Sequence, residues 1–147
     1  MLNVVIGVER AERNGYGAAD FFHLADRLGV TIFYVSDRFE ENKLATIATL
    51  SRLGLPQVRA EQVLLFGPPK AERRAAVERD HRVILHLGDT LHDFDGVFRK
   101  APTEVKRAEV DRNAAHFGAD WIVFPNATYG DWSTAPLTAW DAPLKTQ

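Results

Sequence analysis

Apolar residues recur along this chain in two alternating patterns. Short continuous runs of β-branched, aromatic and leucine residues, of which 31–35 is the clearest, have the composition of strands buried on both faces. Between them lie segments in which apolar residues return every three or four positions, the spacing of an amphipathic helix. The predicted strands are 2–8, 31–35, 63–66, 82–87 and 121–125, and the predicted helices are 18–28, 41–53, 71–80 and 103–117.

This alternation predicts the fold class. Strands that alternate with helices of this length indicate an α/β domain, with a parallel sheet and helices on both of its faces. We expect a single three-layer, Rossmann-like domain over residues 1–147, with an atypical N-terminal segment at 1–16 and an irregular aromatic tail at 127–147. The tail contains Tyr129, Trp132 and Trp140, and we expect it to pack over the sheet edge or over the mouth of a site.

Composition narrows the function classes. A length of 147 residues with 46% hydrophobic content suits one domain with a real core, and a net charge of −2 gives no reason to expect a nucleic-acid partner. Because the chain has no cysteine, disulfides and thiolate metal sites are excluded. No apolar run is long enough for a membrane span. The first residues lack the pattern of a signal peptide, so the chain as written is expected to be cytoplasmic, and exported or lipid-anchored only if further sequence precedes Met1.

The most informative polar groups follow the predicted strand 82–87. Gly88-Asp89 ends this strand, and a second carboxylate, Asp93, comes four residues later. Open α/β sheets bind ligands outside the carboxyl ends of their strands. Hard oxygen ligands in such a loop suit Mg²⁺, which takes one or two carboxylates and completes its shell with water and phosphate oxygens. The alternative is that both carboxylates only cap the loop.

Two other predicted strands are followed by groups suited to phosphate. Ser36 comes directly after 31–35, where a hydroxyl can donate to a phosphate oxygen; alternatively, it caps the helix that begins near Glu41 or forms a turn. Lys70 follows 63–66 and could reach a phosphate, or it is a solvated lysine at a helix start. Because cations are disfavoured at a helix N-terminus, its position hints at an anion nearby.

The remaining histidines and arginines are interpreted more simply. His86 lies within a predicted strand and is interpreted as a packed core residue rather than a ligand. Basic residues on the predicted helices alternate with acids, so they are interpreted as solvated faces. These residues are Arg73, Arg74, Arg79, Arg107 and Arg112.

Five segments, taken together in chain order, resemble one protein family. They are Phe33-Tyr34-Val35-Ser36-Asp37-Arg38, Leu53-Gly54-Leu55-Pro56-Gln57, Lys70 with Arg73, Gly88-Asp89-Thr90-Leu91-His92-Asp93-Phe94, and Phe124-Pro125-Asn126 with Tyr129-Gly130-Asp131-Trp132. They are similar to the class C (lipoprotein-type) acid phosphatases of the haloacid dehalogenase-like (HAD) superfamily. The resemblance runs from about Gly17 to Trp132. It implies a HAD-type sheet and Mg²⁺-dependent hydrolysis of small phosphomonoesters.

The resemblance also implies roles for particular residues. Ser36 would bind a phosphoryl oxygen, Lys70 would neutralise the phosphate and the nucleophile, and Asp89 and Asp93 would hold Mg²⁺. Arg38 and Asn126 would join Ser36 and Lys70 in binding the substrate. The family mechanism is a two-step phosphoryl transfer through an aspartyl-phosphate.

The nucleophile motif of that family, Asp-x-Asp-x-Thr, has no counterpart here. An overlay places Gly7 at the position of the nucleophile and Glu9 at that of the general acid. We therefore expect this chain to correspond to the C-terminal part of such a phosphatase, incomplete at its N-terminus and unable alone to form the covalent intermediate. Unless 2–8 fills the place of the first strand, an exposed sheet position would make the chain poorly soluble or favour a homodimer through that edge.

One smaller departure concerns charge. Asp37 stands where the family has an asparagine, and its negative charge beside a phosphate site would weaken anion binding unless Arg38 or the metal compensates.

Three functions therefore remain open. The first is a Mg²⁺-dependent phosphomonoesterase, and the second is a non-catalytic module that binds phosphate or nucleotide. The third is a structural or partner-binding α/β domain in which Asp89 and Asp93 are only loop caps.

Overall fold

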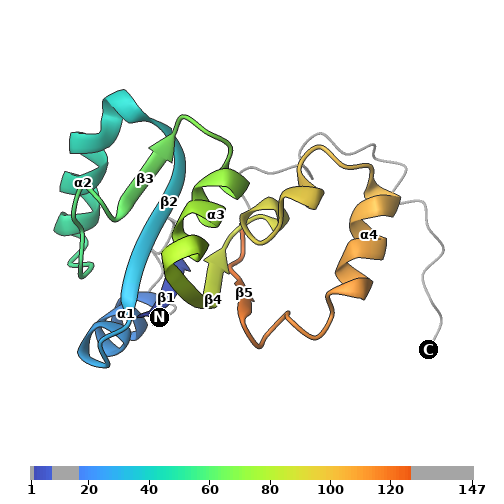
Figure 1. The fold of residues 1–147 in the computed structure, drawn as a ribbon, viewed down its shortest axis with the longest axis horizontal. Helices are drawn as coiled ribbons and strands as arrows, with labels where there is room; N and C mark the ends of the chain where they lie inside the picture. The colour runs from blue at the N-terminus through green and yellow to red at the C-terminus, as the bar shows by residue number, and fades with distance from the viewer. Residues whose placement is uncertain (1, 8–16, 127–147) are drawn as a thin grey trace.

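Parallel strands form the centre of the structure, a computed structural model in which residues 2–7 and 17–126 are described (Figure 1). Within these residues the strands are β1 (Leu2–Gly7), β2 (Thr31–Phe39), β3 (Val63–Phe66), β4 (His81–Gly88) and β5 (Trp121–Val123). The helices are α1 (Ala18–Arg27), α2 (Lys43–Arg52), α3 (Lys70–Asp80) and α4 (Thr103–Arg112), with 3₁₀ turns η1 (Glu40–Asn42), η2 (Leu91–Asp93) and η3 (Gly96–Phe98). The predicted α/β fold is confirmed.

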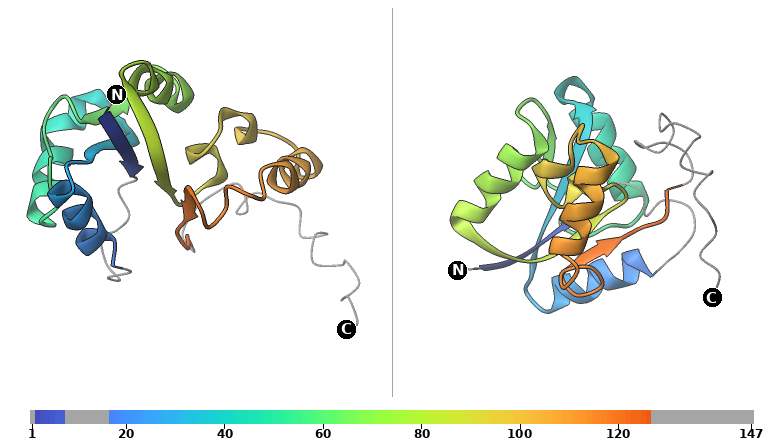
Figure 2. Two further views of the ribbon diagram at one scale, coloured as in Figure 1. Left: turned by 60° about the horizontal axis from the view of Figure 1, so that its bottom comes forward. Right: turned by 90° about the vertical axis from the view of Figure 1, so that its right-hand side faces the viewer.

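The sheet has the order β3-β2-β1-β4-β5, and every neighbouring pair is parallel. The strand predicted at 2–8 is therefore central: Val4 pairs with Thr31 of β2 and with Val83 of β4 (Figure 2). This strand fills the position whose absence would have exposed an edge. The reason for expecting a homodimer through that position is thereby removed.

Helices cover both faces of the sheet. Helices α1 and α2 lie on one face and α3 on the other (Figure 2). Phe22 of α1 and Leu50 of α2 pack against Ile32 and Leu65, and Val77 of α3 packs beside Val35 of β2. A third cluster, made of Phe94, Phe98 and Trp121 with Val110 beside it, anchors α4 near β5. No helix among residues 2–7 and 17–126 combines the length and the apolar composition that a membrane span requires.

The end of β2 differs from the prediction. The strand continues to Phe39, which pairs with Phe66 after an irregularity in the ladder, so Ser36 lies at the irregular end of a strand. Helix α2 begins at Lys43 after η1, too far along the chain for Ser36 to cap it. Within the strand, Ser36 Oγ accepts a local hydrogen bond from the Arg38 N–H at 3.3 Å.

Helix α4 is also shorter than predicted. It ends at Arg112 instead of continuing to 117. The side-chain amide of Asn113 donates to the carbonyl of Glu109 at 2.8 Å, a local bond of the kind that favours helix ends over helix interiors.

The prediction that the arginines lie on solvated faces is wrong for two of them. Arg73 and Arg74 of α3 are only 6% and 5% exposed, while Ala75 is exposed. Arg79, Arg107 and Arg112 are exposed as predicted. Charge alternation along α3 does not show which arginines are buried. Burial of Arg73 and Arg74 depends on hydrogen-bond acceptors that other elements supply.

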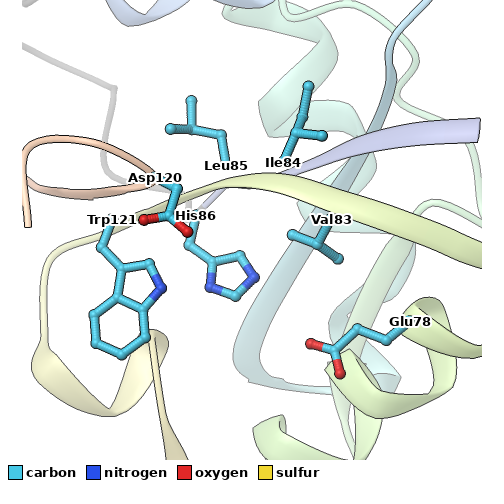
Figure 3. Close-up of a pocket in the computed structure, with 7 residues that line it drawn as sticks. All are labelled: Glu78, Val83, Ile84, Leu85, His86, Asp120 and Trp121. Atoms are coloured by element: carbon cyan, nitrogen blue, oxygen red, sulfur yellow. The ribbon is translucent and has the colours of Figure 1, made fainter. Parts of the chain in front are cut away.

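His86 of β4 lines a pocket of about 240 Å³ together with Glu78, Asp120 and Trp121 (Figure 3). Both of its ring nitrogens are buried and have no hydrogen-bond partner in the described part of the chain. Burial lowers the pKa of His86 to about 4, from the ordinary value of 6.5, and the positive charge of Arg74 acts in the same direction. His86 is interpreted from the sequence as a packed core residue; its ring nitrogens are buried, but the residue is half-buried and its ring borders a cavity.

This lowered pKa predicts a loss of stability in acid. The unfolded chain binds a proton at His86 near pH 6.5, whereas the folded chain resists it until about pH 4. Stability should therefore fall between these values, by up to roughly 3 kcal/mol from this group. Urea unfolding of the wild type and of His86→Asn at pH 7.5 and pH 4.5 measures the effect, and the wild type should lose more. Equal losses in the two proteins would show that His86 does not carry it.

Candidate functional site

The predicted site residues follow successive strands and lie at one end of the sheet. Ser36 and Asp37 lie at the end of β2, Lys70 follows β3, Asp89 follows β4, and Asn126 follows β5. In a parallel sheet the carboxyl ends of all strands lie on the same side. Hydrogen bonds and ion pairs link these residues into one continuous network.

A buried ion pair lies at the centre of this network. The Lys70 ammonium lies 2.6 Å from Asp93 Oδ1, and the two side chains are only 12% and 3% exposed. The other oxygen, Oδ2, accepts from the N–H groups of Asp89 and Thr90 at 3.1 and 3.0 Å and from the Thr90 hydroxyl at 2.9 Å. Burial acts to raise the pKa of Asp93, but the charge of Lys70 and the hydrogen bonds from Lys70 and Thr90 outweigh it and hold the pKa below its ordinary value.

Asp93 therefore has two functions. With Thr90 it forms a capping box at the start of η2, so the alternative that it caps the loop is correct. The same carboxylate also fixes and neutralises Lys70, which a cap alone would not do. Both of its oxygens are engaged with protein donors.

Asp89 lies deeper in the network than a solvated loop residue would. It is 8% exposed, and its Oδ2 accepts from the side-chain amide of Asn126 at 3.0 Å. The Phe124 N–H donates to the Gly88 carbonyl at 2.7 Å and holds the two chain segments together. Asn126, expected at the substrate, thus lies against the expected metal ligand.

Arg73 joins the ends of β2 and β3 to the start of α3. Its guanidinium donates to the carbonyls of Ser36, Leu64 and Pro68 at 2.6, 2.9 and 3.0 Å. It also donates to Asp37 Oδ1 at 2.5 Å. Arg73 is therefore the nearest ion-pair partner of Asp37, whereas the sequence pointed to Arg38 or the metal; the Arg38 side chain is exposed.

Arg74 binds the backbone of the loop that follows β4. It donates to the carbonyls of His92 and Asp93 at 3.1 and 2.7 Å. The sequence did not identify either arginine as buried, although one signal was present. Lys70, Arg73 and Arg74 are three and four residues apart, so they share one face of α3.

The end of β1 bears directly on the missing nucleophile. Gly7, the last residue of β1, pairs in register with Tyr34 of β2. A glycine offers no carboxylate at this point, as the sequence predicted. Glu9, the expected counterpart of the general acid, lies outside the described residues.

The carboxylates of Asp89 and Asp93 meet some of the requirements of a metal site. Among residues 17–126, no group of three or more histidine or acidic side chains is arranged to hold a metal ion. Mg²⁺ does not require such a group, because one or two carboxylates can suffice when water and phosphate oxygens complete its shell. Asp89 fits the direct ligand. Asp93, with both oxygens bound to protein donors, fits a contact through water.

Comparisons with known proteins agree with this geometry. The profile of the family described as "HAD superfamily, subfamily IIIB (Acid phosphatase)" matches residues 8–132. A solved structure of the class C acid phosphatase from Bacillus anthracis is 37% identical over 89% of this chain, with a TM-score of 0.74. A crystal structure of class C acid phosphatase from the same organism, with tungstate bound, is 29% identical over 99% of this chain, with a TM-score of 0.77. The chain spans 55% and 73% of the length of these two relatives. It belongs to the class C acid phosphatases of the HAD superfamily.

Proposed function

We propose that this chain forms the phosphate and Mg²⁺ site of an acid phosphatase that hydrolyses small phosphomonoesters. The observation that supports this most directly is the continuous network from Asp37 through Lys70 and Asp93 to Asp89 and Asn126. It gathers an ammonium and three carboxylates at the carboxyl end of a parallel sheet, and Arg73 links it to the Ser36 carbonyl. The relative solved with tungstate binds a tetrahedral oxyanion, which has the shape of phosphate.

Each group has a defined part in the proposed reaction. The Ser36 hydroxyl donates to a phosphoryl oxygen, and Lys70 offsets the negative charge that phosphoryl transfer concentrates there. Asp89 holds Mg²⁺, which when bound neutralises charge on the phosphoryl oxygens. Asp93 keeps the Lys70 ammonium in place, and Asn126 orients Asp89. Arg38 supports the substrate site through its backbone N–H, which donates to Ser36 Oγ.

A second candidate function rests on a different observation. Gly7 occupies the described end of β1, where the reaction needs a nucleophilic carboxylate. With a glycine there, the chain alone would bind a phosphate compound and not hydrolyse it. Binding without turnover is therefore the expected behaviour of this chain unless residues outside the described part supply the carboxylate.

We expect the full chain to bind tungstate and inorganic phosphate in a manner that requires Mg²⁺. Lys70→Met should weaken tungstate binding by about 10- to 100-fold, because a charge-assisted contact with the anion is lost. Asp89→Asn should abolish the increase in tungstate affinity that Mg²⁺ gives the wild type, because it removes the proposed Mg²⁺ ligand. Isothermal titration calorimetry measures both effects, with circular dichroism to verify that each variant is folded. Lys43→Met, on the surface of α2, is the control for loss of a lysine and should bind as the wild type does.

Three outcomes separate the candidate functions. Mg²⁺-dependent binding together with phosphate release from p-nitrophenyl phosphate supports the phosphomonoesterase. The same binding without release supports the non-catalytic module. A folded wild-type chain that binds no oxyanion, with or without Mg²⁺, would contradict both and leave a structural or partner-binding domain.

A further inference from the structure

Asp37 places a negative charge at the edge of the proposed phosphate site. Its side chain is 47% exposed and lines a pocket of about 150 Å³ together with Lys70, His92 and Arg99. The neighbouring Ser36 and Lys70 are the groups proposed to bind the phosphoryl oxygens. Whatever is attached to the phosphate would therefore lie near this carboxylate.

The carboxylate is fixed in place by Arg73. Asp37 Oδ1 lies 2.5 Å from Arg73 Nη2, and the guanidinium is itself held by the three backbone carbonyls described above. Exposed ion pairs usually contribute little, because both side chains move. Here one partner is only 6% exposed and its hydrogen bonds are made to fixed backbone, so Asp37 is held in one orientation.

The second oxygen faces the Lys70 ammonium and the His92 ring. Asp37 Oδ2 lies 3.9 Å from Lys70 Nζ and 4.0 Å from His92 Nε2, beyond hydrogen-bond length in both cases. The Arg73–Asp37 pair is therefore a dipole whose negative end points into the pocket. A phosphate compound bound to Lys70 would therefore have the negative charge of Asp37 beside it.

We infer that Asp37 determines the charge of the leaving group that this site accepts. It favours phosphomonoesters whose leaving group is neutral or cationic, and it disfavours those that carry a second anionic group close to the phosphate. This inference rests on the proposed function, and it concerns the residue at which this chain departs from the asparagine of the family pattern. Arg99 also lines the pocket, and its charge opposes that of Asp37, so the contribution of Asp37 is the difference between the wild type and Asp37→Asn.

The size of the effect follows from Coulomb's law. A unit charge on the leaving group, about 6 Å from Asp37 in partly exposed surroundings, should change relative affinity by about threefold to tenfold. The effect should shrink as salt is added, because both charges are accessible to ions. If Asp37→Asn acted by changing the shape of the pocket, its effect on affinity would not shrink as salt is added.

The test uses the full chain with Mg²⁺ and three ligands of similar size. Phosphoethanolamine carries a cationic group, ethyl phosphate a neutral one, and 2-phosphoglycolate an anionic one. Isothermal titration calorimetry gives the affinity of the wild type and of Asp37→Asn for each, with inorganic phosphate as the common reference. The wild type should prefer phosphoethanolamine to 2-phosphoglycolate, and Asp37→Asn should reduce that preference by about threefold to tenfold.

Asp111→Asn is the matched control, because it removes the same charge from an exposed position on α4 and should leave the preference unchanged. Asp37→Ser, a second neutral variant, should behave as Asp37→Asn does. If both Asp37 variants bind phosphate but keep the wild-type preference, the inference is wrong while the proposed function stands. If the wild type binds no inorganic phosphate, the proposed function fails, and the inference fails with it.

Discussion

Replacing Asp93 with alanine is expected to lower the free energy of unfolding by about 3–5 kcal/mol, the range found when one partner of a buried ion pair is removed. The variant leaves the Lys70 ammonium, 12% exposed, without its nearest counter-charge. It also removes the acceptor for the N–H groups of Asp89 and Thr90. Urea unfolding at pH 7 measures the change.

The control and the pH dependence sharpen this expectation. Asp111→Ala, exposed on α4, should change stability by less than about 0.5 kcal/mol. Because the pKa of Asp93 is lowered from the ordinary 3.8, its contribution is present above that value and is lost as the pH falls through the lower folded pKa. A loss below about 1 kcal/mol in Asp93→Ala at pH 7 would mean that the ion pair is not buried as described.

Gly88→Ala is expected to cost about 3 kcal/mol and to abolish Mg²⁺-dependent oxyanion binding. A Cβ at Gly88 would lie 2.5 Å from Asp93 Cβ and 2.9 Å from its Oδ2, closer than any real contact. Gly88 is buried and the Asp93 side chain is held by Lys70 and Thr90, so neither can yield without breaking the ion pair. Overpacking of this kind typically costs 1–3 kcal/mol, and here it also displaces the site.

Gly67→Ala is the matched control for Gly88→Ala. A Cβ at Gly67 would meet no atom within 4 Å, so the same substitution should leave both stability and binding close to the wild type. Thermal unfolding and tungstate titration of the two variants give the comparison. Wild-type tungstate binding by Gly88→Ala would show that the close packing of Gly88 on Asp93 is not needed for the site.

Much of the fold followed from local pattern. The alternation of apolar runs with helical spacing predicted the α/β class, and strand 63–66 was predicted with its observed bounds. The end of β2 was not, because pairing of Phe39 with Phe66 extends the strand through polar residues whose pattern resembles a loop. Residue type reports local preference, whereas strand pairing depends on the neighbour.

The composition of the site was also accessible from the sequence. Because parallel strands end on one side of a sheet, Ser36, Lys70 and Asp89 could be assigned to one site before any contact was known, whereas Asn126 followed only from the family resemblance. The absence of a carboxylate at Gly7 could be recognised in the same way, since the residue type alone decides it.

The tertiary structure decided how these groups are held and balanced. Arg73 and Arg74 are buried because carbonyls and a carboxylate from β2, β3 and the loop after β4 satisfy their guanidinium groups, and those acceptors are far away in the sequence. The sequence by itself determined which chemical groups reach the end of the sheet. Which charges are buried, and which partner neutralises each of them, was decided only by the fold, because the cost of burying a charge depends on partners that the fold alone brings within hydrogen-bond distance.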